Sequence, residues 1–142
     1  MSSVLHDVLL AIHFLGLFMG GAAGIGLPVI GATAAGAPAE HRATLGQVAG
    51  RVKRIAQMGI AALIVTGLIM ATMGGVWSDG SVWFWIKLLG VASLVTGVII
   101  GDKVGPKAMQ GDPEAAATAK KVGMANLVSL AVIVFAASFA FH

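Results

Sequence analysis

The sequence contains no cysteine, no tyrosine and very few charged residues. The absence of cysteine excludes disulfides, thiolate-bound zinc, iron–sulfur clusters and cysteine nucleophiles. With 58% hydrophobic and 11% charged residues, the chain lacks the polar side chains that an ordinary soluble surface requires. The net charge of +3 is not accompanied by an aromatic platform for bases, so no nucleic-acid partner is expected. This composition predicts a protein whose surroundings are a lipid bilayer.

Four long apolar runs are visible along the 142 residues. One crossing of a bilayer takes roughly 20 apolar residues, and the runs cover about 4–35, 55–74, 82–101 and 122–141. These runs are far too long for barrel strands, and an open strand edge is not stable in hydrocarbon. We therefore predict an all-α fold over residues 1–142, a single-domain, integral membrane four-helix bundle with up-down topology.

Helix-starting residues precede the second and fourth runs. Pro38 and Glu40 are favourable in a first helical turn, and Asp112-Pro113-Glu114 combines a capping residue with a first-turn proline. We expect the helices that contain these two runs to begin outside the hydrocarbon as amphipathic segments.

The basic residues indicate how the bundle is oriented. Eight of the nine lie in two of the loops: Arg42, Arg51, Lys53, Arg54, Lys103, Lys107, Lys120 and Lys121. By the positive-inside rule these two loops face the cytoplasm. Both termini are then on the non-cytoplasmic side, together with the turn around Trp77 and Trp83. We expect the chain to lie in a bacterial inner (plasma) membrane.

His13 is the first candidate for a functional residue. It lies well inside the first apolar run, where an ionisable side chain costs at least about 2–3 kcal/mol. Gly16, Gly20 and Gly24 follow on the same helical face. Such a ladder allows close helix packing or the approach of a flat ligand, and packing is the commoner use. His6 shares the face but lies near the membrane interface, where we expect solvent.

Lys87 is the second candidate, a basic residue inside the third apolar run. Its long side chain allows the ammonium to reach the headgroup region, which is the ordinary interpretation. The alternative is an inward orientation. The first and third runs enter from the same side, so His13 and Lys87 are expected in the same half of the bilayer. A desolvated, neutral lysine amine can ligate iron.

Weaker signals accompany these two residues. Asn126 lies in the fourth run, where an amide more often bonds a neighbouring helix than a ligand. Met58, Met70 and Met73 are ordinary packing residues or soft ligands for Cu(I). Val65-Thr66-Gly67 recurs as Val95-Thr96-Gly97, but three residues in so biased a composition do not establish a repeat.

Three segments together resemble the HemJ and CopD-like group of small membrane proteins: Ala11 to Pro28, Arg51 to Gly67, and Trp85 to Leu88. The resemblance implies a helical bundle that in HemJ binds haem b and oxidises protoporphyrinogen, with a histidine and a lysine as iron ligands. These ligands correspond to His13 and Lys87, and Met58 and Asn126 correspond to further family positions. The sequence departs from the pattern at Leu127, where the family has an acidic residue, and it lacks the family's tyrosines.

The sequence therefore predicts a haem-b-binding membrane redox protein. His13 and Lys87 are its metal ligands, Gly16, Gly20, Gly24 and Asn126 complete the cofactor site, and no catalytic residue is assigned. The activity is porphyrinogen oxidation or electron relay. Two alternatives stay open: a non-catalytic subunit or assembly partner of a larger membrane complex, and a CopD-like copper-handling protein. A homo-oligomer is compatible with each of them.

Overall fold

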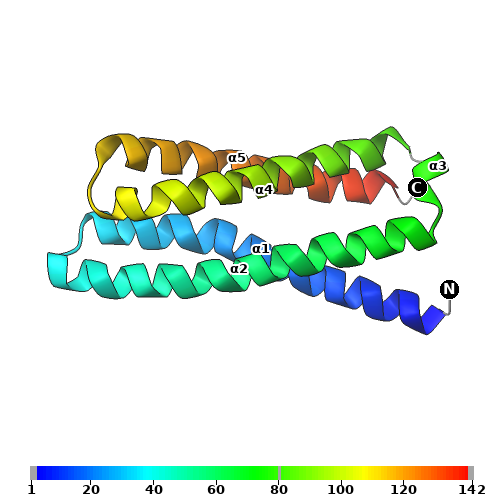
Figure 1. Cartoon of the computed structure of the whole chain (residues 1–142), viewed down its shortest axis with the longest axis horizontal. Helices are drawn as coiled ribbons and strands as arrows, with labels where there is room; N and C mark the ends of the chain where they lie inside the picture. The colour runs from blue at the N-terminus through cyan, green and yellow to red at the C-terminus, as the bar shows by residue number, and fades with distance from the viewer. Residues whose placement is uncertain (1–2, 80, 141–142) are drawn as a thin grey trace.

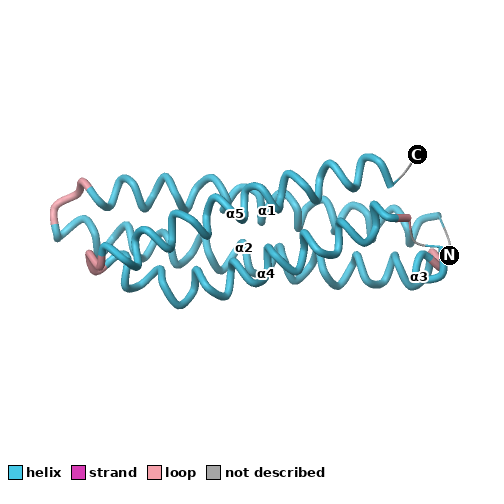
Figure 2. Tube along the Cα trace, turned by 90° about the horizontal axis from the view of Figure 1, so that it is seen from above, coloured by secondary structure: helices cyan, strands magenta, loops and turns pink. Residues whose placement is uncertain are grey.

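The computed structural model describes residues 3–79 and 81–140, and within them the protein is helical almost throughout (Figure 2). The helices are α1 (Ser3–Ala35), α2 (Ala39–Met73), α3 (Val76–Asp79), α4 (Val82–Met109) and α5 (Pro113–Ala140). All except α3 are long and apolar enough to cross a membrane. The all-α prediction is thus confirmed, as are four helices of membrane-spanning length. Residue 141, the expected end of the fourth run, lies outside the described residues.

The helix starts agree with the capping signals in the sequence. Helix α2 begins directly after Pro38, and α5 begins at Pro113. The Asp112 Oδ1 atom accepts hydrogen bonds from the backbone N–H groups of Glu114 and Ala115, at 3.0 and 3.2 Å. These bonds satisfy two of the donors that a helix start leaves unpaired. Both helices consequently begin well before their apolar runs.

Two helical hairpins make up the molecule (Figure 1). Helices α1 and α2 form the first hairpin and α4 and α5 the second, and each hairpin is packed far more extensively within itself than against the other. The turns after α1 and α4 lie at one end, and α3 lies at the opposite end with the start of α1 and the finish of α5. This arrangement places the aromatic residues of α3 and α4 at the end away from the basic turns.

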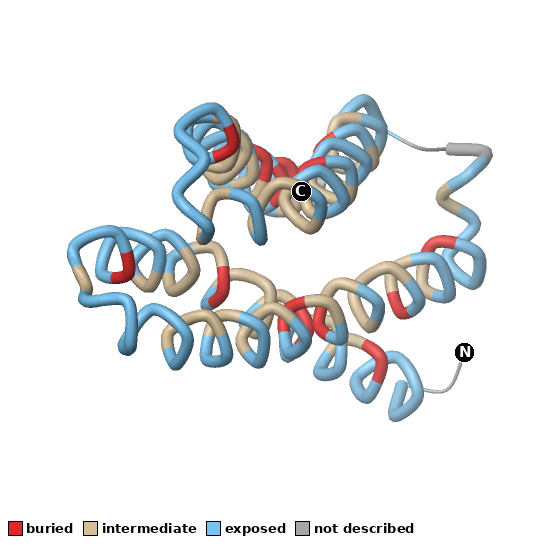
Figure 3. Tube along the Cα trace, turned by 60° about the vertical axis from the view of Figure 1, so that its left-hand side comes forward, coloured by how far each residue is buried: buried red, intermediate tan, exposed pale blue. Residues whose placement is uncertain are grey.

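Most of the buried residues are small, chiefly alanine and glycine, and Figure 3 marks where along the helices burial occurs. At the crossing of α1 and α2, a Cβ added to Gly16 would stand 2.6 Å from the Gly59 carbonyl oxygen. The two backbones therefore touch, which only a missing side chain permits. Large apolar side chains instead face outward, with Phe18 74% and Leu89 73% exposed. An apolar exterior around a small-residue interior is the pattern expected of helices packed in lipid.

Aromatic rings gather near the α3 end. Trp83 stacks on Phe139 with ring centroids 5.0 Å apart, and Trp77 meets Phe84 edge-on at 5.5 Å. Tryptophan is enriched at membrane–water interfaces because its ring is amphipathic. An interfacial position for this cluster stays a prediction.

Candidate functional site

His13 is held in place by a residue of α2. Its Nδ1 atom lies 2.9 Å from the Oγ1 atom of Thr66. Thr66 is 5% exposed, and its hydroxyl donates to the carbonyl oxygen of Ala62 at 2.6 Å. Because that hydroxyl has one proton and gives it to Ala62, Thr66 accepts from His13. We infer that the neutral ring carries its proton on Nδ1, which leaves the Nε2 lone pair available.

A glycine beside Thr66 supports the imidazole ring. A Cβ added to Gly67 would stand 3.3 Å from the His13 Cε1 atom, so the ring packs closely over bare backbone. Thr66 and Gly67 thus fix both the tautomer and the position of the ring. Fixing a ring through its second nitrogen is what proteins do with histidines that ligate metals.

Lys87 comes from the second hairpin. It lies in α4 and is half-buried. Within residues 3–79 and 81–140 its ammonium has no hydrogen bond and no ion pair. His13 and Lys87 thus come one from each hairpin, and their meeting at one iron stays a prediction.

The glycine ladder of α1 lies against other helices. Gly16 contacts Gly59, and a Cβ on Gly20 would be 3.6 Å from Ile60. A Cβ on Gly24 would be 3.6 Å from Leu127 in α5. These glycines therefore allow close contact between helices, as the packing interpretation predicts. Its role toward a flat ligand stays a prediction.

Asn126 packs into a different notch. A Cβ on Gly97 would collide with the Asn126 amide, so this side chain fills the space left by the glycine in α4. The Asn126 Oδ1 atom is buried and has no hydrogen-bond partner among the described residues. Nearby, Ser129 donates a 3.0 Å hydrogen bond to Ser93. Asn126 therefore belongs to the α4–α5 contact.

The methionines of α2 differ in exposure, with Met70 half-buried, and a copper role for them stays a prediction. Met58 is 67% and Met73 48% exposed, on the outer surface of α2. Among the described residues no group of three histidine, aspartate or glutamate side chains is arranged to hold a metal ion. His6 is exposed near the start of α1, as expected.

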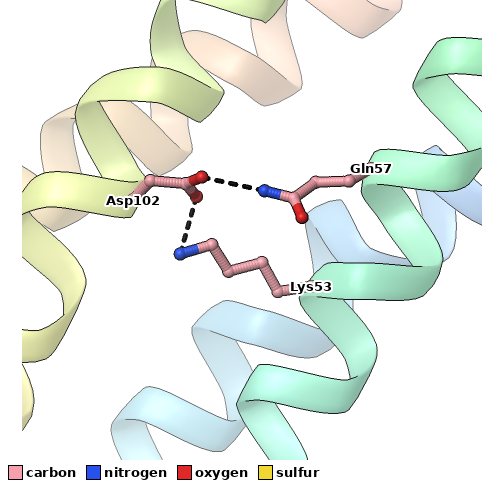
Figure 4. A network of polar contacts seen from close by, with 3 residues as sticks. All are labelled: Lys53, Gln57 and Asp102. Carbon is pink, nitrogen blue, oxygen red and sulfur yellow. Dashed lines mark hydrogen bonds and ion pairs between the residues drawn. The ribbon is translucent and has the colours of Figure 1, made fainter.

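A polar link between the hairpins went unpredicted (Figure 4). Lys53 in α2 forms a 2.6 Å ion pair with Asp102 in α4, and Gln57 Nε2 donates to the same carboxylate at 2.8 Å. Its two charged side chains are about one third exposed, at 33% and 36%. Asp102 directly follows the third apolar run and Gln57 interrupts the second, which is the signal that could have revealed them. Thr66 offered no comparable signal.

Comparison with protein-family models, curated proteins and solved structures finds no match for this chain. The functional argument therefore depends on the residues themselves.

Proposed function

We propose that this protein binds haem b in a bacterial inner membrane and transfers electrons, with His13 and Lys87 as the iron ligands. The observation that carries the proposal is the hydrogen bond from His13 to Thr66. It orients the ring, and the tautomer inferred from it leaves the Nε2 lone pair unprotonated. The unpaired amine of Lys87 supplies the second ligand.

The position of the two residues fits a flat cofactor between the hairpins. His13 comes from α1 and Lys87 from α4, and the hairpins pack sparsely on one another. A mostly apolar groove also lies between α2 and α4, lined by Gln57, Ile60, Ala61, Ile64, Val95, Val98 and Ile99; neither His13 nor Lys87 lines it. Inserting a flat apolar ring between the hairpins would break fewer helix contacts than inserting it at the close Gly16–Gly59 contact within the first hairpin.

The side chains divide the work between them. Bound haem supplies one-electron chemistry. His13 and Lys87 hold the iron, Thr66 keeps the His13 proton on Nδ1, and the apolar helix faces exclude water. Porphyrinogen oxidation also requires a proton acceptor, and Leu127 stands where the HemJ-like pattern has an acid. Electron relay needs no such group, so both activities stay within the proposal.

An absorption spectrum of the purified protein, expressed with ample haem, tests the ligand pair. We expect a Soret band that is lost in His13→Ala and shifted in Lys87→Ala, where a weaker ligand replaces the amine. Thr66→Val should weaken haem retention roughly 10- to 100-fold, the usual effect of removing a group that orients a ligand. His6→Ala, an exposed histidine on the same helix, is the matched control and should change nothing.

Three results would overturn the proposal. A colourless parent that co-purifies with other chains favours a subunit of a larger complex. Metal-dependent copper uptake by a colourless parent favours copper handling. A Soret band that Lys87→Ala leaves unchanged removes Lys87 from the iron.

The proposed orientation follows from the basic residues near the turns after α1 and α4, which by the positive-inside rule face the cytoplasm. Because the chain has no cysteine, each introduced thiol is unique. In intact cells an impermeant thiol reagent should label Ser81→Cys, which precedes α4, and should not label Gln110→Cys in the opposite turn. The reverse labelling pattern would invert the orientation.

A further inference from the structure

An open groove on the second hairpin lies outside the His13 site. Its volume is about 580 Å³, within the range of roughly 300–1,000 Å³ that small-molecule sites occupy. The lining residues are Ser93, Lys120, Lys121, Met124, Ala125, Val128 and Ser129. Five of the seven are uncharged, either apolar or hydroxyl-bearing, and the two lysines, adjacent in sequence, are the charged members. The groove thus has one cationic end and a largely apolar body.

The two lysines are available to an anion. Both are exposed at the start of α5, and neither forms an ion pair within the described ranges 3–79 and 81–140. No acidic residue lines the groove. The nearest acid before the groove in α5 is Glu114, and Asp112 is engaged in capping that helix. The charge of this end is therefore uncompensated.

The order of residues along the groove, charged at one end and apolar beyond it, resembles the order of headgroup and acyl chain in a phospholipid. From residue 122 to residue 140 the chain carries no charged side chain, so Lys120 and Lys121 stand where the apolar part of α5 begins. Ser129 lies two to three helical turns further on, about 13 Å along the axis at 1.5 Å per residue. Along this wall Met124 is 61% and Val128 60% exposed. In a bilayer that covers the apolar part of α5, the cationic end would lie at headgroup level and the apolar wall in the hydrocarbon.

We propose that this groove binds one anionic phospholipid of the surrounding bilayer. Lys120 and Lys121 bind the phosphate, and an acyl chain lies along Met124 and Val128 toward the Ser93–Ser129 pair. Charge complementarity selects the anionic headgroup, because a basic residue near a membrane surface attracts anionic lipid. The exposed, lipid-facing wall selects a membrane lipid over a soluble anion. This inference is independent of haem.

Quenching of a single bimane fluorophore by brominated lipid tests the site. The reporter is attached at Val128→Cys in the otherwise cysteine-free chain, and the protein is reconstituted in phosphatidylcholine vesicles. Brominated phosphatidylglycerol should quench it at a lower mole fraction than brominated phosphatidylcholine, by roughly fivefold for each lysine. A second reporter at Phe18→Cys, a 74% exposed position on α1, should show no such preference.

Matched charge removals complete the test. Lys120→Ala/Lys121→Ala should abolish the preference at Val128→Cys while quenching by phosphatidylcholine continues, which shows that the protein still inserts. Lys103→Ala/Lys107→Ala removes the same charge from α4 at positions outside the groove and should leave the preference intact. Equal quenching by both lipids in the parent would overturn the proposal. So would an equal preference at Phe18→Cys, or one that survives loss of Lys120 and Lys121.

Discussion

The tripeptide Val-Thr-Gly occurs once in each hairpin, and its two copies receive polar side chains in different ways. In α2, Gly67 lies against His13, and the buried Thr66 accepts a hydrogen bond from the ring. In α4, Gly97 receives Asn126, but Thr96 is exposed and its hydroxyl bonds only the Ala92 carbonyl of its own helix, at 2.8 Å. In both helices the glycine leaves the space that a polar side chain from another helix fills. Whether that side chain also finds a hydrogen-bond partner depends on whether the neighbouring threonine faces it.

The difference separates a buried polar group that has a hydrogen-bond partner from one that has none among the described residues. His13 has its Nδ1 atom hydrogen-bonded to Thr66, which orients the imidazole ring. The Asn126 Oδ1 atom is buried without a partner in the described part of the chain, which costs free energy. Substitutions at the two notches should therefore change the free energy of unfolding by different amounts and, for Asn126, in the opposite direction.

The largest effect is expected from Gly97→Ala. The new methyl group would overlap the Asn126 amide and force it out of the notch, so we expect a loss of about 2 kcal/mol in the free energy of unfolding. Gly67→Ala should cost less than about 1 kcal/mol, because the His13 ring needs to move by only a few tenths of an ångström. Unfolding in mixed detergent and dodecyl sulfate micelles, followed by circular dichroism, measures both.

The Gly97 notch also offers a rescue. Gly97→Ala combined with Asn126→Ala removes the overlapping atoms and should recover most of the lost stability. A double variant as unstable as the sum of the two single ones would show that the amide does not occupy the notch.

An intermediate effect is expected from Thr66→Val. The isosteric change leaves the His13 N–H group without its acceptor, which should cost about 1–2 kcal/mol. Thr96→Val is the matched control and should be nearly neutral, because Thr96 is exposed and bonds only within its own helix. The same micelle assay compares them, and equal losses would mean that the two threonines are equivalent.

The smallest effect is expected from Asn126→Leu, with the opposite sign. A side chain of similar size without the unpaired oxygen should leave stability unchanged or raise it by up to about 1 kcal/mol. Destabilisation as large as that of Thr66→Val would show that the amide is bonded in the folded protein.

The sequence predicted much of the fold and part of the site. The apolar runs predicted four long helices, and Asp112 with Pro113 marked the start of α5. His13 and Lys87 stood out because polar side chains in hydrocarbon are costly. Thr66 did not stand out, because a threonine in an apolar run is readily satisfied by its own helix and gives no sign of a partner.

Helix formation is determined locally, whereas helix contacts are not. In lipid the backbone must satisfy its own hydrogen bonds, so an apolar run of sufficient length has to be helical whatever surrounds it. The rotation and register of the helices decide the pairings His13–Thr66, which are 53 residues apart, and Gln57–Asp102, which are 45 apart. The same rotation turns Thr66 inward and Thr96 outward from identical tripeptides. The spacing of residues in the sequence shows which of them share a face of a helix. Which faces contact one another is decided only by the close packing of small residues between helices.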